Sequence, residues 1–201
     1  MNTQSPPTLP KNLELHYAGS IEQLEPYAAQ LLQKSQQEHI KRFEHEDTDP
    51  LGRFSSKVAL GDWMSIERAA FLLIDKSFSN SDGTGRLAGM SWFSPREYPL
   101  PFDTGCDVTF GIRLYKGYAG MGLGASYVYE SHKAATKYAE NHGVWLSAKP
   151  GNQRAMRVYE QNGYGLRGSE DGLVYMTNQD ALNPRRYGAQ PLHESPVGVV
   201  S

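Results

Sequence analysis

Three glycines at alternate positions form the part of the sequence most clearly suited to chemistry. Gly120, Gly122 and Gly124 follow a stretch typical of a strand, residues 107–114, and precede a stretch typical of a helix. Glycine has no Cβ, so its backbone N–H groups can approach a ligand closely. The first N–H groups of a helix have no partner inside it, and the helix dipole makes that end positive. The segment is therefore suited to binding a pyrophosphate.

Two common nucleotide-binding loops fit this segment poorly. A Walker A loop ends in Gly-Lys-Ser/Thr, whereas this one ends in Gly124-Ala125-Ser126. A Rossmann fingerprint needs a further glycine at position 127, where the chain has Tyr127. A purely structural turn is the other alternative, although a tight strand-to-helix turn rarely needs three alternating glycines.

A second segment further along the chain has its own regular spacing. It follows another expected strand, residues 144–148, and opens on an asparagine suited to cap a helix. Written as a pattern, it is N-x-x-A-x-x-x-Y-E-x-x-G-Y. The spaced residues are Asn152, Ala155, Tyr159, Glu160, Gly163 and Tyr164.

Together the two segments resemble the GNAT N-acetyltransferase family. The glycine motif of that family is Gln/Arg-x-x-Gly-x-Gly/Ala, which Gly122 and Gly124 match, and its second motif matches the pattern above. Both motifs in this order are far more specific than either alone. Ala119 stands where Gln or Arg is usual, which removes a side chain that could hold phosphate. The resemblance covers residues 69–177 well and 13–65 in outline.

The resemblance implies a mixed α/β fold. In this GNAT-like acyl-CoA acyltransferase fold, a central mixed sheet is splayed between two parallel strands and flanked by helices. The two strands would be residues 107–114 and 144–148, with acetyl-CoA in the split between them. The pantetheine arm would pair with backbone groups near Ile112 and Leu114. The loop residues that would bind the pyrophosphate are Ala119, Gly120, Met121, Gly122, Leu123, Gly124 and Ala125.

The resemblance also assigns side chains to the reaction. Tyr159 would be the general acid that protonates the departing thiolate, with a purely aromatic core role as the alternative. Asn152 would help hold the cofactor's arm, or would act only as a helix cap. Asp107 and Glu97 are candidate general bases, although a solvated carboxylate is the plainer interpretation of both. The resemblance implies no metal.

The implied reaction is direct transfer of an acetyl group from acetyl-CoA to a primary amine of a small molecule or peptide. It needs no cysteine nucleophile, so Cys106 is interpreted as structural. Two alternatives remain open. One is a GNAT fold that binds acyl-CoA or a partner without catalysis, suggested by Ala119 and the lack of an obvious base. The other is an unrelated nucleotide-binding α/β protein. Dimers are frequent in the family, so a homodimer is possible.

Composition excludes several other classes. The chain has 201 residues, a net charge of −2 and one cysteine. Near-neutral charge argues against general nucleic-acid binding. A single cysteine excludes an internal disulfide and a multi-cysteine zinc site. No apolar run is long enough to span a membrane, and residues 1–12 do not read as a secretory signal. We therefore expect a cytoplasmic protein.

Hydropathy and turn residues divide the chain into polar tails, 1–12 and 178–201, and a domain, 13–177. Ser20 with Gln23 predicts the start of one helix, and Asp49-Pro50 the start of another. Two further helices follow the glycine loop and Asn152. The strands are expected at 13–17, 69–75, 87–93, 107–114, 144–148 and 173–177.

Side-chain environments can be predicted along the same elements. Val58 and Trp63 would lie on the buried side of the second helix. His132 and His142 would lie on the surface or at the end of the helix after the glycine loop. Trp63, Trp92 and Tyr98 would form aromatic walls for the acceptor. Acidic residues expected nearby, compatible with a cationic acceptor, are Glu44, Glu46, Asp47, Asp49, Glu97 and Asp103.

Overall fold

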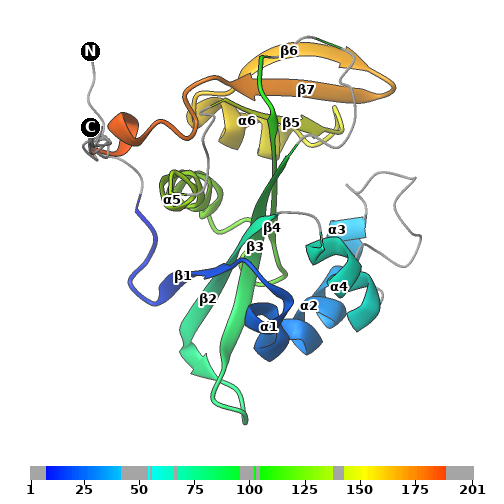
Figure 1. Ribbon diagram of the computed structural model, residues 1–201, viewed down its shortest axis with the longest axis vertical. Helices are drawn as coiled ribbons and strands as arrows, with labels where there is room; N and C mark the ends of the chain where they lie inside the picture. Colours follow the sequence, from blue (N-terminus) through cyan, green and yellow to red (C-terminus); the bar gives the residue numbers. More distant parts are fainter. Residues whose placement is uncertain are drawn as a thin grey trace, which may run out of the picture.

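A seven-stranded mixed sheet with helices on both faces organises the chain in the computed structural model (Figure 1). The structure describes residues 8–41, 54, 56–65, 68–95, 102, 105–137 and 143–188. The strand order is β1-β2-β3-β4-β5-β7-β6. The predicted mixed α/β class is confirmed. The strands are β1 (Leu13–Ala18), β2 (Ala69–Ser79), β3 (Gly85–Pro95), β4 (Val108–Leu114), β5 (Val144–Ala148), β6 (Gly165–Glu170) and β7 (Leu173–Asn178).

The sheet consists of two antiparallel parts joined by one parallel contact. Strands β1 to β4 pair in order as antiparallel neighbours, and β5, β7 and β6 do the same. Only β4 and β5 run parallel. The six predicted strands are confirmed. Strand β6 was missed because its residues are mostly exposed and mostly polar or glycine, without the alternation that marks a half-buried strand.

The helices lie in two layers. The layer on one face holds α1 (Ile21–Leu24), α2 (Ala28–Ser35), α3 (Glu38–Lys41) and α4 (Lys57–Met64), with a short 3-10 helix, η1 (Glu25–Tyr27), between the first two. The layer on the other face holds α5 (Gly124–Ala135) and α6 (Gln153–Gln161). Each layer buries its own apolar core against the sheet. None of the helices in the described ranges is long and apolar enough to cross a membrane.

The first helical segments depart from the expected pattern. The helix predicted to start at Ser20 is divided at Pro26, which lies in η1 because proline cannot continue the α-helical hydrogen bonding. Gln23 accepts a hydrogen bond from the N–H of Gly19 at 2.7 Å, one residue earlier than a capping box requires. The second helix begins after Ser56, whose side chain caps it. The predicted start, Asp49-Pro50, lies outside the described residues. Val58 was expected to be buried, but it is 72% exposed.

Packing continues past both ends of the expected domain. Ala181 and Leu182 are fully buried in the core beneath α5 and α6, although the sequence placed them in a polar tail. The short 3-10 helix η2 (Pro184–Tyr187) follows them, and the Tyr187 hydroxyl donates to the Ala181 carbonyl at 2.5 Å. At the other end of the domain, the side-chain amide of Asn12 donates a hydrogen bond to Oδ1 of Asp75 at 2.9 Å. The folded chain therefore extends beyond residues 13–177.

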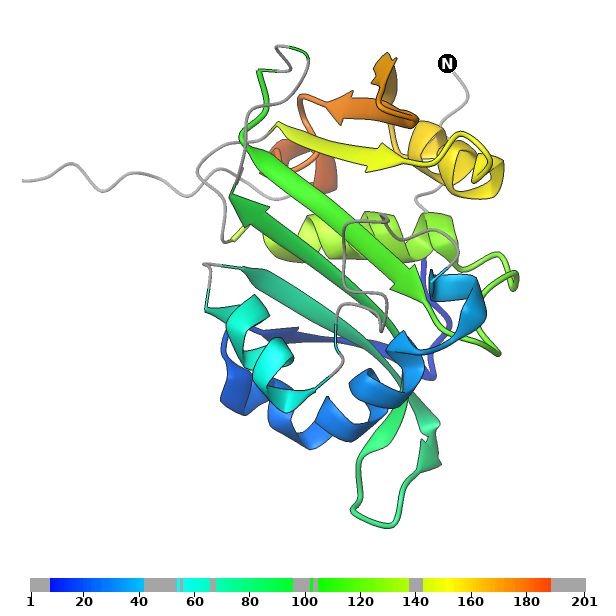
Figure 2. The ribbon, with the colours of Figure 1, turned by 90° about the vertical axis from the view of Figure 1, so that its right-hand side faces the viewer.

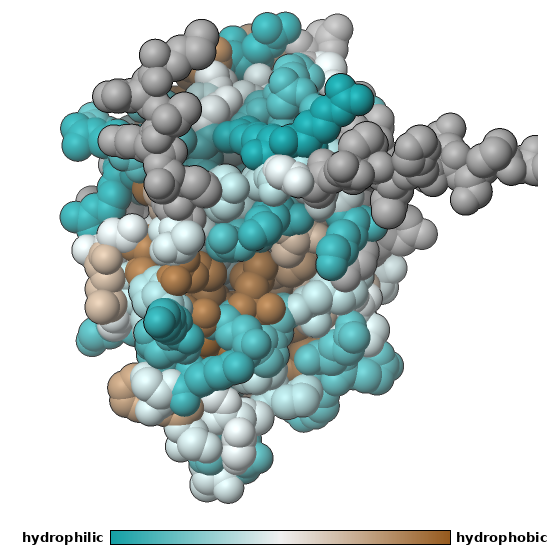
Figure 3. Space-filling view, turned by 90° about the vertical axis from the view of Figure 1, so that its left-hand side faces the viewer, coloured by the Kyte–Doolittle hydropathy of each residue, from teal (hydrophilic) through white to brown (hydrophobic). Residues whose placement is uncertain are grey.

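On the face in Figure 3, polar side chains surround a central apolar area.

His132 lies in the last turn of α5, as predicted, but it is buried in the core, so the prediction of a surface position is wrong. Its Nδ1 lies 2.6 Å from the Val128 carbonyl oxygen, and its Nε2 lies 2.7 Å from the Tyr164 hydroxyl. Burial lowers the pKa of His132 to about 3. The imidazole is therefore neutral at neutral pH. His142 lies outside the described residues.

The burial of Leu182 predicts that the segment after β7 contributes to stability. Leu182→Ala should lower the free energy of unfolding by about 2–5 kcal/mol, because it removes buried methyl groups and leaves a cavity. Leu166→Ala is the matched control, since Leu166 is 69% exposed. This substitution should change the free energy of unfolding by less than about 0.5 kcal/mol. Urea denaturation measures both. Equal effects of the two substitutions would contradict the structure.

The buried neutral His132 predicts acid-sensitive stability. The unfolded chain protonates this histidine near its ordinary pKa of 6.5, whereas the folded chain holds it neutral to about pH 3. The free energy of unfolding should therefore fall as the pH drops below 6.5, by up to about 1.4 kcal/mol per pH unit from this group. Denaturation curves at pH 7.5, 6 and 5 test this. His132→Gln should have a shallower slope, and an unchanged slope would argue against this origin.

Candidate functional site

A cleft of about 1230 Å³ opens where β4 and β5 separate. The two strands pair only at Val108 with Val144 and at Thr109 with Trp145. Beyond that point, β4 keeps β3 on one side and has no strand on the other within the described chain. Figure 2 shows the two strands starting side by side and diverging. The split lies between the two strands that the sequence predicted to form it.

The glycine loop closes one end of the cleft. Gly120 and Gly122 have φ angles of +88° and +79°, in the left-handed region that favours glycine. The N–H of Ala119 donates to the Tyr115 carbonyl at 3.0 Å, and that of Met121 to the Tyr118 carbonyl at 3.3 Å. These two N–H groups thus serve the turn itself. Met121 is 65% exposed and does not line the cleft.

Other N–H groups of the loop and of the start of α5 are available for a ligand. In the part of the chain that the structure describes, none of them donates to a backbone carbonyl. They belong to residues that also line the cleft, with Ala119, Ile112 and Leu114 lining it beside them. An anion placed here would meet several N–H groups at the positive end of α5. The available N–H groups are those of Gly120, Gly122, Leu123, Gly124 and Ala125.

Gly124 has a different role from the other two glycines. A Cβ built on Gly124 would lie 2.9 Å from Cγ2 of Val158, closer than real Cβ contacts allow. Glycine at this position therefore lets the start of α5 pack directly against α6. Both helices contribute residues to the cleft lining, so this contact sets how closely they approach each other beside it.

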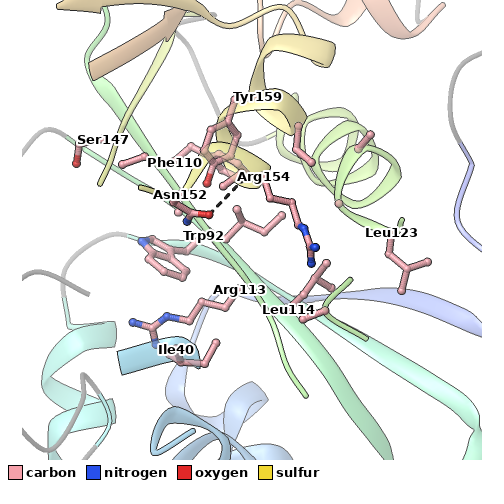
Figure 4. A pocket seen from close by; sticks show the side chains of 18 of the residues that line it. Ile40, Trp92, Phe110, Arg113, Leu114, Leu123, Ser147, Asn152, Arg154 and Tyr159 are labelled. Carbon is pink, nitrogen blue, oxygen red and sulfur yellow. Dashed lines mark hydrogen bonds between the residues drawn. The ribbon is translucent and has the colours of Figure 1, made fainter. Parts of the chain in front are cut away.

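Arg154 brings a positive charge to the glycine loop from α6. Its Nη1 lies 3.2 Å from the position that a Cβ on Gly120 would take. The side chain extends into the cleft on the side of Leu123 (Figure 4). The sequence analysis missed Arg154, although its place two residues after the cap Asn152 is the signal that could have identified it. Lys116 and Lys149 also line the cleft.

Asn152 is the N-cap of α6. Its side-chain oxygen accepts a hydrogen bond from the N–H of Ala155 at 3.4 Å, drawn as a dashed line in Figure 4. The residue also lines the cleft. The capping role is therefore confirmed, and that oxygen is engaged by the helix.

Tyr159 combines a core position with access to the cleft. Its ring belongs to the core on the α5–α6 face, 5.8 Å from the ring of Tyr164. Its hydroxyl points into the cleft, towards Asn152 in the view of Figure 4. Within the described residues the hydroxyl has no hydrogen-bond partner. Burial raises its pKa to about 12, so it carries its proton at neutral pH.

Asp107, one of the two proposed bases, and Cys106 do not line the cleft. Asp107 is exposed. Glu97 lies outside the described residues. No Asp or Glu lines the cleft in the described ranges. Cys106 is buried, and burial raises the pKa of its thiol, which suits a structural residue. The described residues include no group of three His, Cys, Asp or Glu side chains that could hold a metal.

Aromatic side chains line the end of the cleft away from the glycine loop. All three tryptophans of the chain, Trp63, Trp92 and Trp145, line it. Trp92 lies across Gly111, where a Cβ would be 2.1 Å from its ring. Trp63 and Trp92, two of the three aromatic residues predicted to form walls for an acceptor, thus line the cleft. Tyr98 and the expected acidic residues, Glu44, Glu46, Asp47, Asp49, Glu97 and Asp103, lie outside the described residues.

The chain was compared with known proteins. The acetyltransferase (GNAT) family model matches residues 28–164, more than half of the chain. No curated protein matches it. The fold is similar to a spermidine N-acetyltransferase from Vibrio cholerae, solved with CoA and spermine, with a TM-score of 0.63 and 15% identity, covering 87% of this chain and 100% of that one.

Two further solved structures have the same fold. A GNAT-family acetyltransferase from Streptococcus pneumoniae has a TM-score of 0.60 and 17% identity, covering 83% of this chain and 98% of that one. AAC(6')-Ib, solved with ribostamycin and coenzyme A, has a TM-score of 0.61 and 16% identity, covering 86% and 96%. The family match over most of the sheet, with the split between β4 and β5, shows that the chain belongs to the acetyltransferase (GNAT) family.

Proposed function

We propose that the protein is an acetyl-CoA-dependent N-acetyltransferase that transfers the acetyl group directly to a primary amine. The observation that carries this proposal is the early separation of β4 from β5 beside a loop with unused N–H groups. An open strand edge suits an extended arm with amide groups, and the loop suits a pyrophosphate. Family membership and the CoA-bound structural neighbours support the same cosubstrate.

The residues present fit CoA in two ways. Backbone groups near Ile112 and Leu114 on β4 would bind the pantetheine arm as an added strand. The pyrophosphate would bind the N–H groups of the loop, a narrower set than the sequence predicted because Ala119 and Met121 use theirs within the turn. Arg154 would supply the positive charge that Ala119 lacks. The residues proposed to bind the pyrophosphate are then Gly120, Gly122, Leu123, Gly124, Ala125 and Arg154.

Bound acetyl-CoA would supply the acetyl group as a thioester. The amine nitrogen forms a bond to the carbonyl carbon while the bond from that carbon to sulfur breaks. Tyr159 donates its hydroxyl proton to the departing sulfur, and its raised pKa keeps that proton in place until then. The proton lost by the amine passes to water in the open cleft, whose described lining holds no carboxylate, and Tyr159 regains a proton from that water. Glu97 stays the predicted alternative base.

The acceptor is an amine of a small molecule or peptide, and it would enter at the tryptophan-lined end of the cleft. Amines such as spermine and ribostamycin are bound in the structural neighbours. A cytoplasmic location and a homodimer belong to the same proposal. A second candidate is a non-catalytic acyl-CoA-binding module, which Ala119 and the lack of a carboxylate in the described cleft favour. Release of free CoA thiol with any amine distinguishes the two.

Arg154 should strengthen CoA binding. Arg154→Ala removes a charge-assisted contact to phosphate and should raise the Kd for CoA by about 10-fold or more. Arg157→Ala is the matched control on the same helix, since Arg157 is exposed and does not line the cleft. It should leave the Kd within about twofold, as a distant surface charge is screened. Isothermal titration measures both, and similar Kd values for the two variants would exclude a role for Arg154.

Tyr159 should act in chemistry rather than in binding. Tyr159→Phe keeps the aromatic ring in the core and removes only the acidic proton. It should lower kcat by about 100-fold or more, the usual range for a general acid, while the Kd for CoA changes little. Thiol release at saturating acetyl-CoA measures kcat. A variant with wild-type kcat would show that another group protonates the thiolate.

A further inference from the structure

A buried carboxylate lies on the strand next to the glycine loop, outside the cleft. Asp75 of β2 is 3% exposed and is the only Asp or Glu among the buried described residues. A buried charge is costly unless hydrogen bonds satisfy it. The groups that donate hydrogen bonds to Asp75 therefore indicate which parts of the molecule it positions.

The two oxygens of Asp75 contact different parts of the molecule. Oδ1 accepts from the Asn12 amide at 2.9 Å, from the Ser77 N–H at 2.9 Å and from the Ser77 hydroxyl at 2.5 Å. Oδ2 accepts from the Tyr118 hydroxyl at 2.8 Å. Burial alone would raise the pKa of Asp75, but these hydrogen bonds lower it to about 2. The bond from Tyr118 is therefore made to a charged carboxylate at neutral pH.

Tyr118 is the residue at which the glycine loop begins. Its N–H donates to the Tyr115 carbonyl at 3.0 Å, and its own carbonyl accepts from Met121 at 3.3 Å. Its ring packs in the same buried cluster as Leu123, which is the N-cap of α5 at the far end of the loop. The residues at the two ends of the segment that carries Gly120 and Gly122 thus lie in one buried cluster.

We propose that Asp75 is a positioning residue for the phosphate-binding loop and acts through Tyr118. The proposal rests on the proposed function, because the loop is taken to bind CoA. Glycine-rich segments have many accessible conformations, and a flexible loop must be ordered when ligand binds. A charge-assisted hydrogen bond to the rigid sheet orders the loop beforehand. The N–H groups of Gly120 and Gly122 then face the ligand without further rearrangement.

A pair of matched variants tests this role. Tyr118→Phe and Ser77→Ala each remove one hydroxyl that donates to Asp75, but only Tyr118 belongs to the loop. Tyr118→Phe should raise the Kd for CoA and the KM for acetyl-CoA by about 5- to 10-fold, with the effect on KM rather than on kcat. Ser77→Ala should leave the Kd and the KM within about twofold of their wild-type values. Asp75→Asn in the Tyr118→Phe background should raise the Kd no further.

Amide hydrogen exchange in the protein without CoA gives a second measurement that needs no activity. Exchange at Ala119 and Met121, whose N–H groups are hydrogen-bonded within the loop, should be faster in Tyr118→Phe than in wild type, and unchanged in Ser77→Ala. The role of Asp75 would be overturned if the two variants changed the Kd and the exchange rates equally. It would also be overturned if neither variant changed them. Lack of CoA binding by the wild-type protein would instead overturn the proposed function, so the two failures are distinguishable.

Discussion

Strands β4 and β5 share only two residue pairs before they separate, and the position of the site follows from this short contact. Each strand is held along its length by a different antiparallel neighbour, β4 by β3 and β5 by β7. The sheet therefore stays continuous although its centre opens. The gap that opens beside β4 beyond the second pair is the cleft.

The chemistry of the site depends on how the two helices meet at this opening. Gly124 allows α5 to start directly against Val158 of α6. Asn152 fixes the start of α6, so that Arg154 reaches the glycine loop from one turn and Tyr159 reaches the centre of the cleft from the next. In the proposed function, phosphate binding and proton donation would therefore both come from the same short helix. The glycine loop adds N–H groups. We propose that Asp75 positions that loop through the hydrogen bond that it accepts from Tyr118.

The sequence predicted the elements whose signals are local. Strand β2 was predicted from its first residues, 69–75, because a continuous apolar run marks a strand covered on both faces. The cap at Asn152 was also predictable from residue type. Strand β6 was missed because it is exposed and lacks an alternating pattern. The burial of Leu182 and His132 could not be predicted either, since long-range packing places both in the core.

For the candidate site, residue type indicated the glycine loop and the family resemblance indicated Tyr159, but neither showed how individual N–H groups are used. Ala119 and Met121 donate within the turn, a fact that depends on the loop's conformation. The contact between Arg154 and the loop joins α6 to Gly120, and its only signal in the sequence is the place of Arg154 just after the cap Asn152. The contact of Asp75 has no such signal, because Asp75 is distant in sequence from the loop that it contacts. Spacing therefore located the site, while tertiary packing decides which groups are free to act.

The most direct test of the central claim is a titration of the ¹⁵N-labelled protein with CoA, followed by amide NMR shifts. The amides of Gly120, Gly122, Leu123, Gly124 and Ala125 should shift most as the pyrophosphate binds, and those of Ala119 and Met121 should shift less. Shifts along β4 near Ile112 should accompany them. A titration that leaves the loop amides unchanged, or moves only amides outside the cleft, would contradict the account.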